Sequence, residues 1–422
     1  MSGSEPAATT AVLPVVTAEP VTDAPAEPEP AEDGPVDDEP VEDGPAGPVE
    51  AAGRGRRDRP PGRDPLWARL LVVLGTLLLV ASGTAITGTK VLAHRYDATV
   101  KKGKLIADTA RAGGVQARPR LTGPFNYLLI GSDARADDPT AGQRSDTIII
   151  VHIPATMDRA YLISIPRDLR VQIPPFPKTG FLGSREKING AFDYGHGGED
   201  GVQLLSQTLF NLTGIAFDGA AVVDFGGFQK VIEQLGSIYM CVDERTESQH
   251  IGYDKNGKFL APWYGPEGSY RNPASTPVVY EPGCQRMKPW QALDYSRQRK
   301  SIPDADYGRQ RHQQQLLKAM FDEARRQGII TKPGKLDSII RAVGASLTID
   351  TGGVSLADLA YALRDVNPGD LVGIKLPSEP RDIGGFSYVL ALDDQATTLY
   401  DAIRNDTLDT WVGQNTTWVN GL

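Results

Sequence analysis

The sequence predicts an α/β protein in which a single mixed central sheet is flanked by helices, preceded by one N-terminal transmembrane helix. Short runs rich in β-branched residues recur from residue 126 onward, and segments with the apolar spacing of helices alternate with them. Residues 70–89 carry no charged side chain, and about 20 such residues suffice to cross a bilayer as a helix. The chain thus divides into an N-terminal membrane part and one large folded domain.

The N-terminal part has a strongly uneven charge distribution. Residues 1–53 contain thirteen acidic residues and no Lys or Arg, so we expect a disordered, Pro-rich cytoplasmic tail. Residues 54–69 hold six arginines and two aspartates, and this basic side of the apolar run should remain in the cytoplasm. A cleaved signal peptide is the alternative interpretation. The late position of the run favours an uncleaved signal anchor at 70–89, with the rest of the chain extracytoplasmic.

The remaining chain is expected to form a polar stalk at 90–123, a catalytic domain at 124–405 and a C-terminal tail at 406–422. Once the acids of residues 1–53 are set aside, 40 of the 53 acidic residues remain against 44 basic ones. The basic segment 54–69 accounts for this small excess, so the domain itself is nearly neutral. A general nucleic-acid-binding protein requires a basic face, and this class is therefore disfavoured.

Three predicted strands gather charged residues at one end of the sheet. Residues 126–130 and 160–165 are apolar runs followed by charges, whereas the run 147–153 is preceded by them. If consecutive strands pair antiparallel, these charges share one rim of the sheet. The residues concerned are Asp133, Arg144, Asp146, Arg167 and Asp168. Such a rim indicates a binding site, while a set of loop salt bridges remains an open alternative.

The elements that follow alternate between helix and strand. The acids at 199–200 suit the N-terminus of a helix over 202–212, and Pro289 suits the first position of another. Residues 244–283 are rich in Gly, Pro and Tyr and are expected to form an irregular surface excursion. The other expected elements are strands at 220–223, 237–242, 371–376 and 387–392 and helices at 227–235, 306–328, 355–366 and 395–404.

The helix expected from an N-cap at Asp306 to Gly328 carries arginine on an apolar stripe. Positions spaced by three and four residues place Arg309 and Gln313 in line with Leu316, Met320 and Ala324. A guanidinium that faces the core keeps its charge and therefore needs an anion beside it. This anion is either a protein carboxylate or a bound phosphate.

Two further arginines, Arg297 and Arg299, precede this helix by one short turn and are expected near its start. Together with Arg144, Arg167 and Arg309 they outnumber the nearby acids, which favours a polyanionic ligand such as a pyrophosphate. Asp133 and Asp146 would then be free to hold a hard cation, most simply magnesium, Mg²⁺.

The only two cysteines, Cys241 and Cys284, both lie beyond the predicted membrane segment. Outside the cell they are expected to form one disulfide, with a pair of unlinked buried thiols as the alternative.

Several motifs occur in the order typical of one family. They cover about residues 124–325 and comprise 128–133, 144–147, 164–168, 187–191, 223–228, 291–299 and 306–315, with a weaker match at 382–385. On these motifs the chain resembles the LytR–CpsA–Psr family of cell-wall glycopolymer transferases. Two positions depart from the family pattern: His312 stands where many relatives have Arg, and Lys288-Pro289 where they have Asp/Asn-Gly.

The resemblance implies a mixed α/β sheet with a deep apolar pocket for a polyprenyl tail and a mouth that holds pyrophosphate and Mg²⁺. It implies that glycan phosphate passes from its polyprenyl carrier to a peptidoglycan hydroxyl. Asp133 and Asp146 match the metal-side carboxylates. The arginines Arg144, Arg167, Arg297, Arg299 and Arg309 match the pyrophosphate clamp, and Lys187, Asn189, Asp306 and Gln313 match supporting residues.

Two other functions remain open on the sequence. A hydrolase could release the glycan phosphate of the same lipid-linked substrate into water. A non-enzymatic envelope protein could bind the lipid-linked glycan or serve in regulation. The base that accepts the proton of the acceptor hydroxyl is not evident, and Asp133 is one candidate.

Overall fold

The computed structural model describes residues 101–113, 123–132, 145–264, 270–329, 338–339, 341–354 and 366–422, all within the unit Arg69–Leu422. The predicted tail, basic segment and membrane helix lie outside these ranges, as do Asp133, Arg144 and all but the last residue of the helix expected at 355–366. Over the described ranges, no helix combines the length and apolar composition needed to cross a bilayer.

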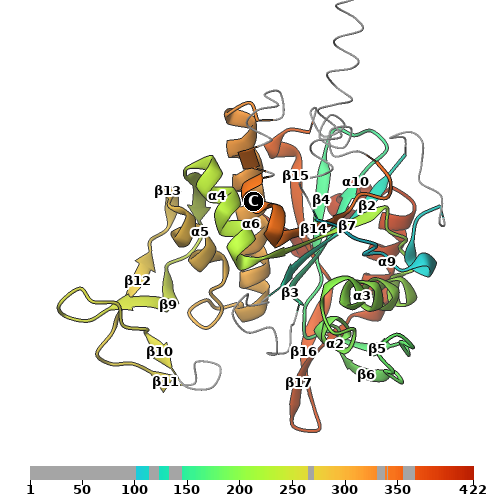
Figure 1. Cartoon of the computed structure of the whole chain (residues 1–422), viewed down its shortest axis with the longest axis horizontal. Helices are drawn as coiled ribbons and strands as arrows, with labels where there is room; N and C mark the ends of the chain where they lie inside the picture. The colour runs from blue at the N-terminus through green and yellow to red at the C-terminus, as the bar shows by residue number, and fades with distance from the viewer. Residues whose placement is uncertain are drawn as a thin grey trace, which may run out of the picture. The chain divides into compact units, whose positions relative to one another are not determined.

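The centre of the fold is an eight-stranded mixed sheet with strand order β1-β14-β7-β2-β3-β4-β15-β18 (Figure 1). β2, β3 and β4 pair antiparallel as predicted, whereas β7 joins β2 and β15 joins β4 in parallel. The sheet strands are β1 (Lys101–Lys102), β2 (Phe125–Ser132), β3 (Ser145–Ile153), β4 (Ala160–Ser164), β7 (Gly219–Asp224), β14 (Leu347–Asp350), β15 (Leu371–Lys375) and β18 (Val419–Asn420). The predicted single mixed sheet is therefore confirmed.

Successive side chains along β2 and β3 point to opposite faces of the sheet, so these strands contribute apolar residues to both faces. Leu128 and Ile130 are fully buried in the main core, to which α2 (Asn189–Tyr194), α3 (Gly198–Thr213), α9 (Asp393–Arg404) and α10 (Leu408–Gln414) contribute. Phe125 and Tyr127 point to the other face, where Phe321 of α6 (Ala305–Arg326) packs against them. Helices thus flank both faces of the sheet.

A second hydrophobic cluster forms where α6 meets α4 (Phe225–Leu235), α5 (Pro289–Ser296) and the antiparallel pair β8 (Ile238–Val242) and β13 (Gly283–Met287). The side chain of Asp224 caps α4 by accepting the backbone N–H of Gly227 at 2.7 Å. Pro289 occupies the start of α5, as predicted. This cluster supports α6 along the length that carries the arginines.

The prediction of an irregular excursion at 244–283 is wrong for the parts of that segment that form strands. It contains β9 (Thr246–Tyr253), paired antiparallel with β12 (Thr276–Tyr280), and a short hairpin of β10 (Trp263–Tyr264) and β11 (Tyr270–Arg271). The pairing of β9 with β12 joins residues far apart in a polar, Gly- and Pro-rich sequence, so no local period revealed it. Figure 1 shows this arm extending away from the sheet beside β13.

Two hairpins lie near the end of the sheet where β4 ends. The shorter consists of β5 (Arg170–Ile173) and β6 (Ser184–Lys187), and the other of β16 (Ser378–Ile383) and β17 (Phe386–Ala391). The backbone N–H of Val389 in β17 donates to the carbonyl of Asp168 at 2.9 Å, which links the second hairpin to the chain just before β5. Short 3₁₀ turns at Asp108–Ala110, Gly344–Ser346, Pro368–Asp370 and Thr416–Trp418 complete the described elements.

Parts of the predicted stalk and tail belong to the fold. Leu105 and Ile106, from the segment expected as a stalk, are fully buried in the main core, and β1 pairs with β14. In the segment 406–422, α10 contributes Trp411 to the same core and β18 pairs with β15 at the sheet edge.

Candidate anion-binding site

Arg167 lies among three carboxylates at the rim where β3 begins and β4 ends. Its Nη1 atom contacts Oδ1 of Asp146, and its Nε atom lies 3.7 Å from Oδ2 of Asp168 and 3.9 Å from Oδ1 of Asp306. Burial opposes the charge of this guanidinium, but the three carboxylates outweigh it and raise the pKa of Arg167. The antiparallel strands thus bring Asp146, Arg167 and Asp168 together as predicted.

Arg309 is the most deeply buried arginine of this group, with 6% of its surface exposed. Its Nη2 atom lies 2.6 Å from Oδ1 of Asp306 and donates to the backbone carbonyl of Asp146 at 3.3 Å. Burial lowers the pKa of Arg309, and the nearby charges of Arg167 and Arg299 act in the same direction. A guanidinium nevertheless stays charged in a protein and needs a counterion. The sequence left open whether this counterion is a protein carboxylate or a bound phosphate, and the structure places the carboxylate of Asp306 there.

Unsatisfied donors remain in this cluster. The Nε atoms of Arg167 and Arg309 are both buried and form no hydrogen bond with the described part of the chain. Buried polar groups are normally paired, and an orphaned donor therefore calls for an explanation such as a missing ligand. The arrangement suits an anion whose oxygens approach these two arginines.

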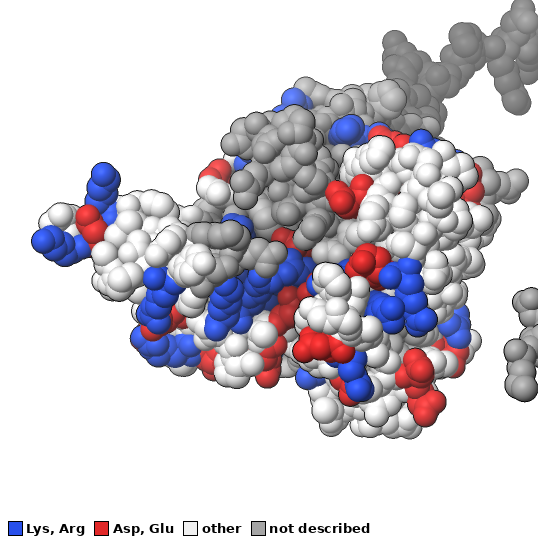
Figure 2. Space-filling view, turned by 90° about the horizontal axis from the view of Figure 1, so that it is seen from below, with Lys and Arg blue, Asp and Glu red and all other residues white. Residues whose placement is uncertain are grey.

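A pocket of about 450 Å³ opens beside Arg167. Its lining residues are Arg167, Asp168, Glu186, Lys187, Asn189, Gly190, Asp193, Tyr194, Arg299 and Phe386. Three of these are basic and three acidic, so the predicted excess of positive charge is not found in the pocket lining. Figure 2 shows basic and acidic side chains side by side across the middle of the lower face, between areas of uncharged side chains.

The charged residues that line this pocket differ in whether they form an ion pair with another protein residue. Lys187 Nζ lies 3.0 Å from Oδ1 of Asp168, whereas Arg299 has no carboxylate of the described residues within 4.0 Å. Arg299 reaches the pocket from the segment after α5, in agreement with the prediction that it lies near the start of the arginine helix. Arg297 is held differently, with Cζ 4.2 Å from the ring centroid of Phe225.

The supporting residues predicted at the mouth are only partly assembled. Asn189 is 6% exposed and lines the pocket. Gln313 is half-buried and does not line it. The neighbouring Gln314 is the fully buried one, and its amide donates to the carbonyls of Leu162 and Ile374 at 2.8 and 3.0 Å.

Two predictions about the arginine helix need correction: the set of residues on its buried face and the residue at its N-cap. α6 also buries Gln310, His312 and Gln314, because the sheet and the second cluster contact it on different sides. The N-cap position is Asp304 rather than Asp306, and no side chain caps the helix there. Asp306 lies in the first turn, where its carboxylate holds Arg309 instead.

His312 does not take part in the pocket. It is fully buried, stacks on Tyr295 with ring centroids 4.1 Å apart, and places Nε2 3.2 Å from Oδ1 of Asp243. Asp243, Glu244 and His312 could together hold a metal ion. Arg311 already supplies positive charge there, since its guanidinium pairs with both Asp243 and Glu244.

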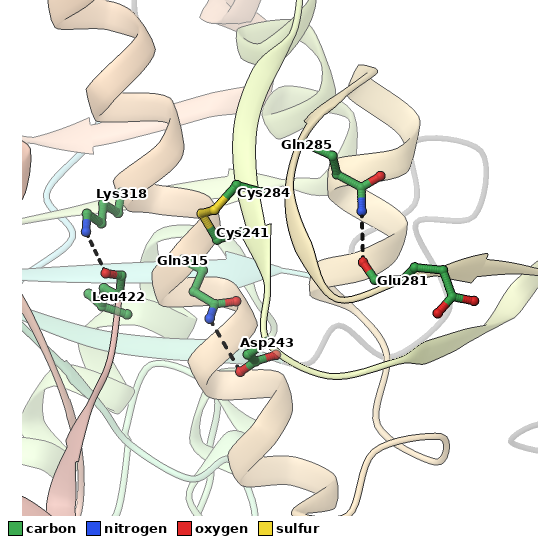
Figure 3. The surroundings of a disulfide bond; sticks show 8 residues. All are labelled: Cys241, Asp243, Glu281, Cys284, Gln285, Gln315, Lys318 and Leu422. Atoms are coloured by element: carbon green, nitrogen blue, oxygen red, sulfur yellow. Dashed lines mark hydrogen bonds between the residues drawn. A yellow bond between two sulfur atoms is a disulfide. The ribbon is translucent and has the colours of Figure 1, made fainter.

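The predicted disulfide is confirmed. Cys241 and Cys284 are direct partners in the β8–β13 pair and are joined by a disulfide across 43 positions of sequence. Figure 3 shows the bridge beside α6, near the bond from Gln315 to Asp243. No other cysteine is present.

Sequence reasoning missed the residues that complete the pocket: Glu186, Asp193, Tyr194 and Phe386. Two signals were available. Asp193 and Tyr194 lie two and three residues after the motif at 187–191, and Phe386 directly follows the weak match at 382–385. What remained hidden was that the β16–β17 hairpin reaches the same pocket as α2.

Fold and site together define an α/β protein with buried, carboxylate-held arginines beside a charged pocket. The chain belongs to the LytR_cpsA_psr family, whose model matches residues 87–405. It is 29% identical to the polyisoprenyl-teichoic acid–peptidoglycan teichoic acid transferase TagU of Halalkalibacterium halodurans, over 54% of this chain and 61% of that protein. It is 30% identical to the transferase TagV of Bacillus subtilis, over 54% of this chain and 49% of that protein.

These matches therefore span about half to three fifths of each relative's length. Among solved structures, the protein gbs0355 of Streptococcus agalactiae superposes with a TM-score of 0.54 at 21% identity, covering 68% of this chain and 88% of that one. This likeness supports the mixed sheet with flanking helices.

Proposed function

We propose that the chain is a phosphotransferase that moves a glycopolymer phosphate from a polyprenyl-pyrophosphate carrier onto a hydroxyl of peptidoglycan. The observation that carries this proposal is the pair Arg167 and Arg309, whose buried Nε donors form no hydrogen bond with the described residues. Arg167 also lines the pocket that contains Arg299. The names of two relatives as teichoic acid–peptidoglycan transferases support the same class of reaction.

The described arginines would contribute to pyrophosphate binding in two different ways. Arg167 and Arg309 are pre-positioned by Asp146 and Asp306, so little side-chain entropy is lost when an anion binds. Arg299 lacks a protein counterion among the described residues, and the phosphate would provide one. Lys187 lines the same pocket, whereas Arg144, Arg297 and Gln313 join this set by motif position alone.

In the reaction, the acceptor oxygen forms a bond with the phosphorus that carries the glycopolymer. The bond from this phosphorus to the bridging oxygen breaks, and polyprenyl phosphate leaves with the electron pair. The arginines stabilise the charge that develops on the transferring and departing phosphates. The proton of the hydroxyl passes to a base, for which Asp133 remains a candidate.

We further propose that Asp146 and Asp133 hold Mg²⁺. The donor type fits, because carboxylate oxygens are the ligands that this ion prefers. Asp146 uses Oδ1 to accept from Arg167, and its Oδ2 accepts no hydrogen bond from the described residues. When bound, the ion would act as a Lewis acid at a phosphate oxygen.

The proposed setting is the cell envelope. A signal anchor at residues 70–89 would hold the domain on the extracytoplasmic side, next to its lipid-linked substrate. An apolar pocket for the polyprenyl tail also belongs to this proposal.

The test uses the full-length protein in detergent micelles with a synthetic polyprenyl-pyrophosphoryl sugar and a peptidoglycan oligomer. Phosphodiester-linked product is followed with and without Mg²⁺. We expect Arg299→Ala to reduce the rate about 100-fold or more, because a charge-stabilising donor is lost. Arg159→Ala is the matched control, since Arg159 is exposed, does not line the pocket and forms its ion pair with the exposed neighbour Asp158.

Each alternative function gives a different result. Sugar phosphate released into water without coupling would identify a hydrolase. Tight lipid binding without turnover would identify a binding or regulatory protein. Equal rates for Arg299→Ala and Arg159→Ala would refute the assignment of the site.

A further inference from the structure

We propose that the pocket beside Arg167 has a separate wall that binds the acceptor as a neutral saccharide. This acceptor wall consists of Glu186, Asn189, Asp193, Tyr194 and Phe386, all of which line the pocket. The inference deepens the proposed function, because it names the part of the same site that would receive the hydroxyl-bearing substrate.

Charge is the first argument for the acceptor wall. Glu186 and Asp193 form no ion pair with any described residue, unlike Asp168, which pairs with Lys187. Unpaired carboxylates repel a pyrophosphate, so they would weaken binding if the donor occupied this wall. The same carboxylates accept strong hydrogen bonds from neutral hydroxyl groups.

An amide that opens onto the pocket is the second argument. Asn189 is 6% exposed and lines the pocket, and no described residue forms a hydrogen bond with its side chain. Its amide atoms are not among the fully buried side-chain atoms that lack a partner, so they are accessible to a ligand. An amide that can both donate and accept suits the hydroxyl and acetamido groups of an amino sugar. Its position at the start of α2 places it between Lys187 and the carboxylate of Asp193 in sequence.

Aromatic rings are the third argument. Tyr194 stacks on Phe181 with centroids 4.4 Å apart, which fixes the orientation of its ring. Phe386 is 68% exposed although it lines the pocket. The C–H face of a sugar packs well on the negative face of an aromatic ring. Exposed and fixed rings next to hydrogen-bonding groups are therefore better suited to a saccharide than to a phosphate.

The carboxylates of this wall do not belong to a three-residue metal site. Of the residues the structure describes, only Asp243, Glu244 and His312 come close enough together to form one. In the wall, Oε1 of Glu186 already accepts the backbone N–H of Lys187 at 2.9 Å.

The experiment measures binding rather than turnover, with the full-length protein in detergent micelles. Two probes are titrated by calorimetry: a peptide-free oligosaccharide of peptidoglycan, and a short-chain polyprenyl pyrophosphate. We expect the variant Glu186→Gln/Asp193→Asn to bind the oligosaccharide at least about tenfold more weakly, because charged hydrogen bonds are lost. Its affinity for the pyrophosphate should be unchanged or higher. The control Asp394→Asn/Asp409→Asn removes two exposed acids outside the pocket and should behave as wild type.

Arg299→Ala should show the opposite pattern, with weaker pyrophosphate binding and retained oligosaccharide binding. If the wild-type protein does not bind the oligosaccharide with or without the pyrophosphate, the acceptor wall is refuted. The same holds if the double variant binds it as well as the control does, or if the free stem peptide binds there instead. Failure of transfer with an intact crossed pattern would overturn the proposed reaction and leave the saccharide site standing.

Discussion

Removal of the disulfide tests how the second hydrophobic cluster is stabilised. The bridge joins Cys241 and Cys284, which are exposed partners on adjacent strands. The perturbation is the double variant Cys241→Ser/Cys284→Ser. Because both residues are exposed, a mild reductant should produce the same effect in the folded wild-type protein.

The magnitude follows from the length of chain that the bridge closes. With a sequence separation of 43 between the two cysteines, loop closure in the unfolded chain accounts for about 4 kcal/mol at room temperature. The exposed serines leave no cavity and bury no polar group, so no second large cost is expected. The double variant should therefore unfold with about 4 kcal/mol less free energy than the oxidised protein.

The assay is urea unfolding of the full-length protein in micelles, followed by tryptophan fluorescence. Trp290 reports on this region because it lies at the start of α5. The reduced wild-type protein and the double variant should coincide at the lower midpoint, and the pyrophosphate affinity should change little, since neither cysteine lines the pocket. A loss below about 1 kcal/mol would contradict the loop-closure reasoning.

Two further predictions concern carboxylates that pair with α6: Asp306 within the helix and Asp243, which directly follows β8. Asp306→Asn should destabilise the protein by about 3 kcal/mol or more, because it leaves the buried Arg309 without its carboxylate, and Asp306→Asn/Arg309→Met should recover part of this loss in thermal melts. Burial of Asp243 disfavours its charge, but His312 and Arg311 outweigh it and hold its pKa below the usual range. Its contribution is thus present above about pH 4 and lost as the pH falls further. Asp243→Asn should cost about 1.5 kcal/mol at pH 7 and progressively less below pH 4, and a constant difference would contradict this assignment.

The rim of the sheet could be predicted because local patterns determine it. Apolar β-branched runs define β2, β3 and β4, and their antiparallel pairing places the charged ends together. The contact between Asp146 and Arg167 follows directly from that pairing. Motif spacing then added Arg299 and Asn189, which the structure finds in the pocket lining.

Other features depend on tertiary contacts that have no local signal. The buried face of α6 could not be read from one apolar stripe, because Gln314 is buried through bonds to the strands β4 and β15. The β9–β12 pairing likewise joins segments on either side of a polar loop. In both places long-range hydrogen bonds compensate for a composition that predicts exposure.

A count of charges was the weakest part of the sequence reasoning about function. The predicted cation excess disappears in the pocket lining, where three basic and three acidic residues occur. What determines the chemistry is which charges are already paired. Arg167 and Lys187 form ion pairs with carboxylates. Arg299, Glu186 and Asp193 form no ion pair with any of the described residues. A neutral lining with unpaired charges of both signs suits two ligands of different chemistry, an anion and a hydroxyl-rich partner, which is what transfer between two substrates requires.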